Sequence, residues 1–229
     1  MNLFKVAQNC IYVLLMVMYA NTIDAQTINT IVGTSMGGYG PDTAVATTSK
    51  LNYPSGVAID KSGNLYIADA NNNRVRKVTT AGIITTVAGT GKAGYGGDGR
   101  AATGAQLKYP TDVAVDEAGD VYVTDYGNSR IRKITSSGII STVAGNGTIG
   151  VAGDGGPAYA AQLHDPAGIA VDADGNLYIA DKYNYRVRKI DRQGVIMTVA
   201  GNGYAGWEGD RGAATNARLN NPAGVTIDA

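Results

Sequence analysis

The sequence predicts an all-β protein, built as a β-propeller of four-stranded antiparallel blades. One observation is a 56-residue repeat, kept by leucines, prolines and aspartates alike and illustrated by Leu51, Leu107, Leu163 and Leu219. A fixed period of this length indicates one supersecondary unit copied along the chain. Each copy also holds four short runs rich in β-branched residues, and the chain has 32 glycines but one phenylalanine. This pattern is typical of turn-rich β proteins and not of helical ones.

The first copy shows why four strands are expected. Its short runs are residues 56–60, 65–69, 74–78 and 83–88, and Gly, Asn or Asp residues close each of them. Such runs are typical of antiparallel strands joined by hairpins. The single helical candidate is the alanine-rich segment 100–106, which is long enough for one turn.

The side chains of the first strand explain why the sheets should stack. Val57 and Ile59 point to one face while Gly56 and Ala58 point to the other, so neither face offers charge to water. A sheet that is apolar on both faces needs neighbours on both sides. Stacking around an axis, with the first strand of each blade innermost, gives a propeller. A solenoid is the alternative, and the strand hairpins favour the radial blades.

The repeats divide the chain into predicted blades. Partial repeats flank three complete ones, and the boundaries are 26–50, 51–106, 107–162, 163–218 and 219–229. The last partial repeat is expected to hold a first strand at residues 224–228. Closed propellers have at least four blades, so we expect an incomplete ring. The chain is then either a piece of a longer exported protein or an open arc that associates with a second copy of itself.

Residues 1–25 have the features of a secretory signal peptide. Lys5 precedes a short apolar run from Cys10 to Ala20, and the small residue Ala25 stands at the expected cleavage point. A transmembrane anchor would need about 20 apolar residues. We therefore expect a secreted protein, extracellular or periplasmic, with no membrane insertion after cleavage.

The charge of the chain bears on the class of its partner, and its cysteine content bears on how the fold is stabilised. The chain has 19 basic and 19 acidic residues. Its basic residues form no stripe of the kind that binds nucleic acid, so we expect no nucleic-acid partner. Its one cysteine, Cys10, falls within the signal peptide, so the exported chain must be held by packing and not by disulfides.

The residues of one repeat resemble a known family. The run Pro-x-Gly-Val-Ala-Ile-Asp with Gly-Asn-Leu-Tyr-Ile-Ala-Asp-x-x-Asn-x-Arg-Val-Arg-Lys, from Pro54 to Lys77, looks like the NHL repeat. The insertion Gly97-Asp98-Gly99 is similar to that of bacterial extracellular NHL proteins and of the teneurin NHL domain. The resemblance implies a propeller fold. Family members bind proteins, RNA or glycans, and a few related propellers are enzymes, so the fold does not name the function.

A polar motif recurs in every blade. An aspartate stands three residues before an asparagine and five before an arginine, which gives Asp69, Asn72 and Arg74, then Asp125, Asn128 and Arg130, then Asp181, Asn184 and Arg186. A catalytic or metal site needs one asymmetric set of residues, whereas this motif is the same in each copy. We expect each aspartate to accept hydrogen bonds from its own loop and each of these arginines to pair with an acid.

Binding residues are expected on the rim with the longer loops. The loop between the second and third strands and the loop into the next blade open on this rim, and both vary between copies. Their aromatic residues suit a protein partner or a sugar face. The candidates are Tyr95, Tyr126, Tyr183, Tyr185 and Trp207, together with Asp112, which replaces a repeated glycine at the entrance of an innermost strand. The alternatives are that each ring packs over its own glycine-rich loop, and that Asp112 is a tolerated surface change and does not face the central channel.

An enzyme is the alternative function. Propeller lyases and lactonases hold a metal at the channel through several His or acidic ligands. This chain has one histidine, His164, and no catalytic set can be assembled from the sequence. We expect no cofactor and no catalytic or metal-ligating residues, while a structural calcium ion near Asp112 stays an alternative.

Overall fold

The chain folds into β-strands and single 3-10 turns throughout residues 28–228, which are the part that the computed structural model describes. The predicted signal peptide, residues 1–25, lies outside this part. The chain divides after Thr30, and every strand belongs to the unit that begins at Ile31. Within residues 28–228, no helix is long and apolar enough to cross a membrane. The all-β prediction is confirmed.

The first blade is a sheet of five antiparallel strands. From the outer edge inward, the order is β1 (Ala44–Val45), β5 (Ile83–Ala88), β4 (Arg74–Val78), β3 (Leu65–Asp69) and β2 (Pro54–Ile59). The four longer strands are those predicted, except that β2 begins two residues and ends one residue earlier than the predicted run. The two-residue β1 was not predicted, because it lies in the loop that leads into the blade.

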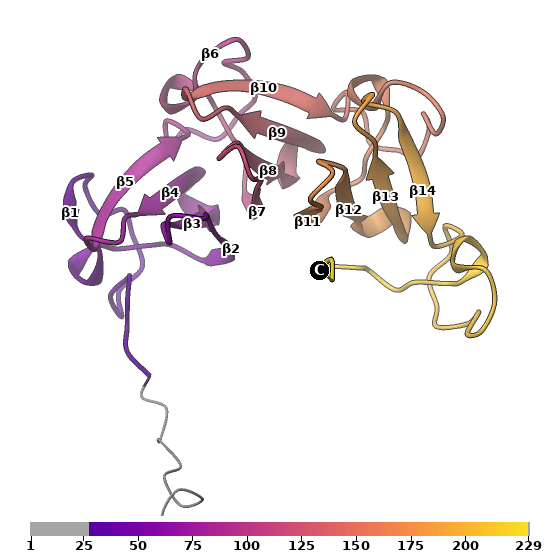
Figure 1. The fold of residues 1–229 in the computed structure, drawn as a ribbon, viewed down its shortest axis with the longest axis horizontal. Coiled ribbons are helices and arrows are strands. Elements are labelled where there is room, and N and C mark those ends of the chain that lie inside the picture. The colour runs from indigo at the N-terminus through magenta and orange to yellow at the C-terminus, as the bar shows by residue number, and fades with distance from the viewer. Residues whose placement is uncertain (1–27, 229) are drawn as a thin grey trace, which may run out of the picture. The chain divides into compact units, whose positions relative to one another are not determined.

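The second blade repeats this arrangement, and the third repeats it without the two-residue outer strand (Figure 1). The second blade contains β6 (Arg100–Ala101), β10 (Ile139–Ala144), β9 (Arg130–Ile134), β8 (Val121–Asp125) and β7 (Pro110–Val115). The third contains β11 (Pro166–Val171), β12 (Leu177–Asp181), β13 (Arg186–Ile190) and β14 (Ile196–Ala200).

Two sets of 3-10 turns lie in the loops between the strands. One set lies in the loops that lead into β2, β7, β11 and the C-terminal segment, and comprises η1 (Ala46–Thr48), η3 (Ala102–Gly104), η5 (Ala158–Ala160) and η7 (Ala214–Asn216). The helical turn predicted within residues 100–106 is η3. The other set joins the second and third strands of each blade and comprises η2 (Ala70–Asn72), η4 (Tyr126–Asn128) and η6 (Lys182–Asn184).

The inner strands hold neighbouring blades together. β7 contacts both β2 and β11, and these strands are innermost in Figure 1. Val113 of β7 is 3% exposed within a core that the first and second blades share. A Cβ on Gly56 would lie 2.6 Å from the Cα of Asp112. Glycine at this repeated position therefore allows two inner strands to approach closely, as the small residues on this face predicted.

The prediction of a strand at residues 224–228 is wrong. This segment has no strand pairing, although Val225, Thr226 and Ile227 lie along the inner strands like a first strand of the next blade. A Cβ on Gly168 of β11 would come within 2.7 Å of the Ala223 carbonyl oxygen. In the three blades each first strand pairs with the second strand of its own hairpin, and residues 224–228 have no such partner within residues 28–228. The predicted incomplete ring stays a prediction.

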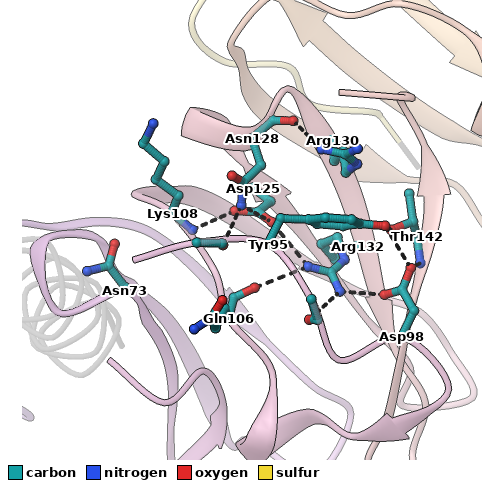
Figure 2. A network of polar contacts seen from close by, with 12 residues as sticks. Asn73, Tyr95, Asp98, Gln106, Lys108, Asp125, Asn128, Arg130, Arg132 and Thr142 are labelled. Atoms are coloured by element: carbon teal, nitrogen blue, oxygen red, sulfur yellow. Dashed lines mark hydrogen bonds and ion pairs between the residues drawn. The ribbon is translucent and has the colours of Figure 1, made fainter. Parts of the chain in front are cut away.

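A buried arginine lies at the centre of the second blade (Figure 2). Arg132 of β9 is fully buried, and its Nη1 donates to Asp125 Oδ2 at 3.2 Å. The same carboxylate accepts the Lys108 backbone N–H at 2.7 Å and the Asn128 side-chain amide at 2.9 Å. Asp125 thus ties the end of β8 to its own loop and to the segment that enters the blade.

Arg132 also binds the loop that arrives from the first blade. Its guanidinium pairs with Asp98 and donates to the carbonyl oxygens of Gly96 and Gln106, each at 3.3 Å. Each blade has this arrangement, in which one arginine pairs with two aspartates; the other sets are Arg76 with Asp69 and Asp42, and Arg188 with Asp181 and Asp154. One cation per blade therefore joins the sheet to the preceding connecting loop.

The prediction about which arginine pairs with an acid is wrong. The ion pairs come from Arg132 and its equivalents, whereas Arg130 donates to the carbonyl oxygens of Asn128 at 3.0 Å and Asn146 at 2.7 Å. Arg74 and Arg186 also donate to loop carbonyls. Positions 130 and 132 share one face of β9. Arg130 is the first residue of β9 and lies nearest the loop. Arg132 lies two residues further along the strand and reaches the buried carboxylate of Asp125.

Replacing the buried arginine should cost far more stability than replacing an exposed lysine. We expect Arg132→Ala to lower the free energy of unfolding by about 3–5 kcal/mol, because Asp125 would keep a buried charge without its cation. Lys61 pairs with Glu117 at 3.1 Å in solvent, so Lys61→Ala should cost less than about 1 kcal/mol. Urea unfolding followed by circular dichroism measures both. Equal losses for the two variants would contradict the role assigned to Arg132.

Candidate functional site

The long loops of each blade meet on one rim. The loop between the second and third strands is joined to the preceding connecting loop by an asparagine side chain in all three blades. Asn72, Asn128 and Asn184 donate to the carbonyl oxygens of Gly38, Gly94 and Gly150, each at 2.7 Å. We call this side of the molecule the long-loop rim. The shared rim that the sequence predicted for these loops is therefore observed.

Unusual backbone geometry shapes the rim loops. Each 3-10 turn between the second and third strands ends in a non-glycine residue with left-handed φ: 50° at Asn73, 50° at Ser129 and 54° at Tyr185. Tyr109, just before β7, has a φ of 52°. Its N–H donates to Asn73 Oδ1 at 2.9 Å, so a loop of the first blade holds the start of the second. These conformations cost energy and persist only where surrounding contacts impose them.

Four ring side chains and a lysine gather between the rim loops of the second and third blades. The rings of Tyr109 and Tyr126 meet edge to face at 6.0 Å, and those of His164 and Tyr183 lie 5.1 Å apart. The Lys182 Nζ lies 5.8 Å from the Tyr126 ring centroid and 5.2 Å from that of Tyr183. The lysine links the two ring pairs through cation–π contacts. We call these five residues the rim cluster.

Tyr126 keeps its proton throughout the physiological range. Burial raises the pKa of its phenol, and hydrogen bonding to Tyr183 together with the negative charge of Asp165 raises it further. The hydroxyl is therefore a hydrogen-bond donor or acceptor and not a base. This chemistry suits recognition of a partner.

Tyr95 has a different environment from the rim cluster. Its ring lies beneath the guanidinium groups of Arg130, at 3.7 Å, and Arg132, at 5.0 Å (Figure 2). Its hydroxyl donates to Asp98 at 3.2 Å. The contacts of Tyr95 thus belong to the buried arginine and its acids, although part of the side chain stays exposed.

The remaining aromatic candidates, Trp207 and Tyr185, make no ring contact with the rim cluster among the described residues. Trp207, in the loop after β14, is 87% exposed. It occupies the repeat position of Tyr95, but no arginine of a following blade lies over its ring in the described residues. Tyr185 is partly buried at the end of η6. Of the five predicted aromatic residues, the structure places only Tyr126 and Tyr183 in the rim cluster.

Asp112 bridges two inner strands. One carboxylate oxygen accepts the Val113 N–H at 2.9 Å, and the other accepts the Ile169 N–H of β11 at 2.9 Å. The residue also lines the hollow between the inner strands. A calcium ion here stays a prediction, and it would have to compete with two backbone amides. Among residues 28–228, no three His, Cys, Asp or Glu side chains come together as a metal site.

Sequence reasoning missed three members of the rim cluster. Tyr109, His164 and Lys182 belong to positions that vary between copies: Lys182 has Ala70 and Tyr126 as equivalents, and His164 has Asn52 and Lys108. The differences between copies at these positions can be seen in the sequence. We used His164, the single histidine, only as an argument against a catalytic site. Grouping the variable positions that precede each first strand with those that follow each second strand would have found the cluster.

The buried carboxyl of Asp112 predicts a pH dependence. Burial raises its pKa above the ordinary value, and the hydrogen bonds from Ile169 and Val113 offset this only in part. A raised folded-state pKa favours the folded protein at low pH, and this contribution is lost as pH rises from about 3.9 through the folded pKa. The free energy of unfolding of the wild type should therefore fall relative to that of Asp112→Asn as pH rises.

Urea unfolding of both proteins from about pH 3 to about pH 7 measures this difference. Asp112→Asn removes the titrating group and keeps the shape of the side chain, so other pH effects cancel between the two proteins. A difference that stays constant, or that moves in favour of the wild type as pH rises, would contradict the assignment.

Comparisons with known proteins agree with the repeat architecture. The family model described as Teneurin NHL domain matches residues 91–152 and 148–207, and the NHL repeat model matches residues 51–78. Mouse Teneurin-4 is 33% identical over 162 residues, which are 62% of this chain and 6% of Teneurin-4. SUPPRESSOR OF QUENCHING 1 of Arabidopsis thaliana is 37% identical over 97 residues, which are 42% of this chain and 9% of that protein. The chain thus spans less than a tenth of either relative.

A solved structure shares the fold. An auxiliary nutrient binding protein from Bacteroides thetaiotaomicron has a TM-score of 0.60 at 17% sequence identity, covering 86% of this chain and 50% of that one. Together with the repeated four-stranded blades, these matches show that the chain belongs to the NHL-repeat family, in the form represented by the teneurin NHL domain.

Proposed function

We propose that this chain is an exported, non-catalytic binding module that recognises a protein or a glycan through its long-loop rim. The rim cluster carries the proposal. Two tyrosines that come from equivalent loops of neighbouring blades, Tyr126 and Tyr183, lie on either side of one lysine. Aromatic rings held in fixed positions are the side chains that most often anchor protein partners, and they also stack on sugar faces.

The support of the rim makes the cluster suitable for recognition. Tyr126 and Lys182 belong to 3-10 turns that begin directly after Asp125 and Asp181, and these aspartates are held by the buried arginines. The turns are thus fixed to the sheet before any partner arrives. Preorganisation of this kind lowers the entropy cost of binding.

The polar residues of the blades support a role without catalysis. Asp69, Asp125 and Asp181 make the same contacts in each blade, with a backbone N–H, an asparagine and a buried arginine. These contacts account for the aspartates as supports of the loops. The signal peptide predicted at residues 1–25 supports export, to the cell exterior or the periplasm.

Replacing the two rim tyrosines should abolish recognition and leave the fold intact. The purified chain is first applied to a glycan array and to a panel of purified extracellular proteins, and each hit is titrated. We expect saturable binding without turnover, and a loss of at least about tenfold in affinity for the double variant Tyr126→Ala, Tyr183→Ala, since aromatic anchors of an interface contribute about 2 kcal/mol or more.

Tyr159→Ala is the matched control. This tyrosine is exposed, as Tyr183 is, and it lies in the connecting loop that enters the third blade, outside the rim cluster. Its replacement should leave affinity unchanged. The proposal fails if the double variant binds its hit as well as the wild type, or if the chain chemically converts the ligand.

A further inference from the structure

A second candidate site lies on the opposite rim, between the first and second blades. A cleft of about 410 Å³ opens there. The first blade contributes the turn between β2 and β3 and part of β4, and the second contributes the turn between β9 and β10. We call this side the short-turn rim. Since the asparagines and the rim cluster lie on the other rim, this cleft is separate from the proposed recognition surface.

The cleft combines a polar wall with an apolar floor. Asp60, Asn64 and Lys77 form the polar wall from the first blade. The Asp60 carboxylate already accepts from the Asn64 amide, the Tyr66 hydroxyl and two backbone N–H groups, so Lys77 and the serine hydroxyls of the lining are left for a ligand. Val87 of the first blade, which is partly buried, provides most of the floor, and Val121 and Ile134 of the second blade, each 3% exposed, add only their edges. A few placed polar groups over apolar side chains are the usual composition of a small-molecule site.

The ammonium group of Lys77 has N–H donors that Asp60 does not engage. Lys77 Nζ lies 3.8 Å from Asp60 Oδ2, beyond hydrogen-bond distance. The equivalent Lys133 in the second blade lies 2.7 Å from Asp120 Oδ2 and is engaged. The difference arises because Asn64 stands in the first blade where the second has Asp120. An ammonium group has three N–H donors, so Lys77 can offer hydrogen bonds to a ligand.

Small side chains keep the cleft open. Thr135 and Ser136 line it from the second blade, and the third blade has Asp191 and Arg192 at the equivalent positions. Arg192 lines a different hollow, together with acidic residues that include Asp116. A long charged side chain at position 136 would occupy space that the serine leaves free. The cleft is therefore specific to the junction of the first two blades.

We propose that this cleft binds a neutral mono- or disaccharide. The negative charge of Asp60 and the positive charge of Lys77 cancel, so the cleft favours a ligand without net charge. Sugar hydroxyl groups can accept from Lys77 and exchange hydrogen bonds with the Ser62 and Ser136 hydroxyls, while the C–H face of a sugar ring packs on Val87. The volume lies near the lower end of the range of about 300–1,000 Å³ that is typical of ligand pockets, as a small sugar requires.

Saturation-transfer NMR on the whole chain tests the proposal directly. The probes are glucose, galactose, mannose, cellobiose and lactose, each titrated at millimolar concentrations. We expect saturable transfer to at least one sugar, with ring C–H protons receiving more saturation than the outer ones. Ser136→Arg should weaken that binding by about tenfold or more, which corresponds to about 1.4 kcal/mol, because the arginine fills the cleft.

The chain supplies its own control. Arg192→Ser makes the reciprocal exchange at the equivalent turn, outside the cleft, and should leave sugar affinity unchanged. Both variants use a residue that the repeat already holds at this position, and thermal unfolding checks that each remains folded. Lys77→Gln provides a second variant within the cleft and should also weaken binding.

The outcomes separate this site from the long-loop rim. If Tyr126→Ala, Tyr183→Ala abolishes sugar binding while Ser136→Arg does not, the sugar binds at the rim cluster and the cleft proposal is wrong. It is also wrong if none of the five sugars shows saturable transfer. Loss of binding in Ser136→Arg and Lys77→Gln, with Arg192→Ser unchanged, supports it.

Discussion

Each sheet of this protein is apolar on both faces, and this constraint determines the rest of the structure. Val113 of the second blade is 3% exposed because the first blade covers it, whereas the equivalent Val57 of the first blade is 62% exposed. The same residue type at the same repeat position is thus buried or exposed according to whether a neighbouring sheet covers it. Packing covers the faces of the blades, so the recognition that we propose falls to the rims.

The buried arginines connect this packing to the rims. Each one reaches an aspartate at the end of a second strand and another in the connecting loop from the preceding blade. Burying a charge is costly unless it is paired and hydrogen-bonded, so both loops must hold a defined geometry for the cation to be satisfied. The rim loops are therefore rigid for the same reason that the blades are stable, while their outward-facing residues stay free to vary.

The two rims use this freedom differently. On the long-loop rim, neighbouring blades bring Tyr126 and Tyr183 to either side of Lys182. On the short-turn rim, Asn64 and Ser136 leave a cleft where another copy has Asp120 or Arg192. In both places the repeated backbone is the same, and single residue differences between equivalent positions of the blades create the local feature. Comparison of the copies within one chain shows which positions support the fold and which differ between blades.

Much of the blade could be predicted from sequence because its signals are local. Strands β3, β4 and β5 have the predicted bounds, since alternating β-branched residues and glycine turns act over a few residues. The helical turn η3 was found in the same way. Residues 224–228 were mispredicted, because a strand depends on its partner as well as on its own side chains.

The sequence by itself determined the repeat, the four-stranded blade and the rim on which the variable loops lie, because these follow from periodicity and turn chemistry. Only the tertiary structure decided that Arg132 and not Arg130 reaches the acids, and that Tyr126 meets Lys182 while Tyr95 lies beneath arginines. The physical reason is that these contacts join residues of different strands and blades. Their distances depend on how far each side chain lies from the rim and on how one sheet packs against the next, and neither is encoded in local spacing.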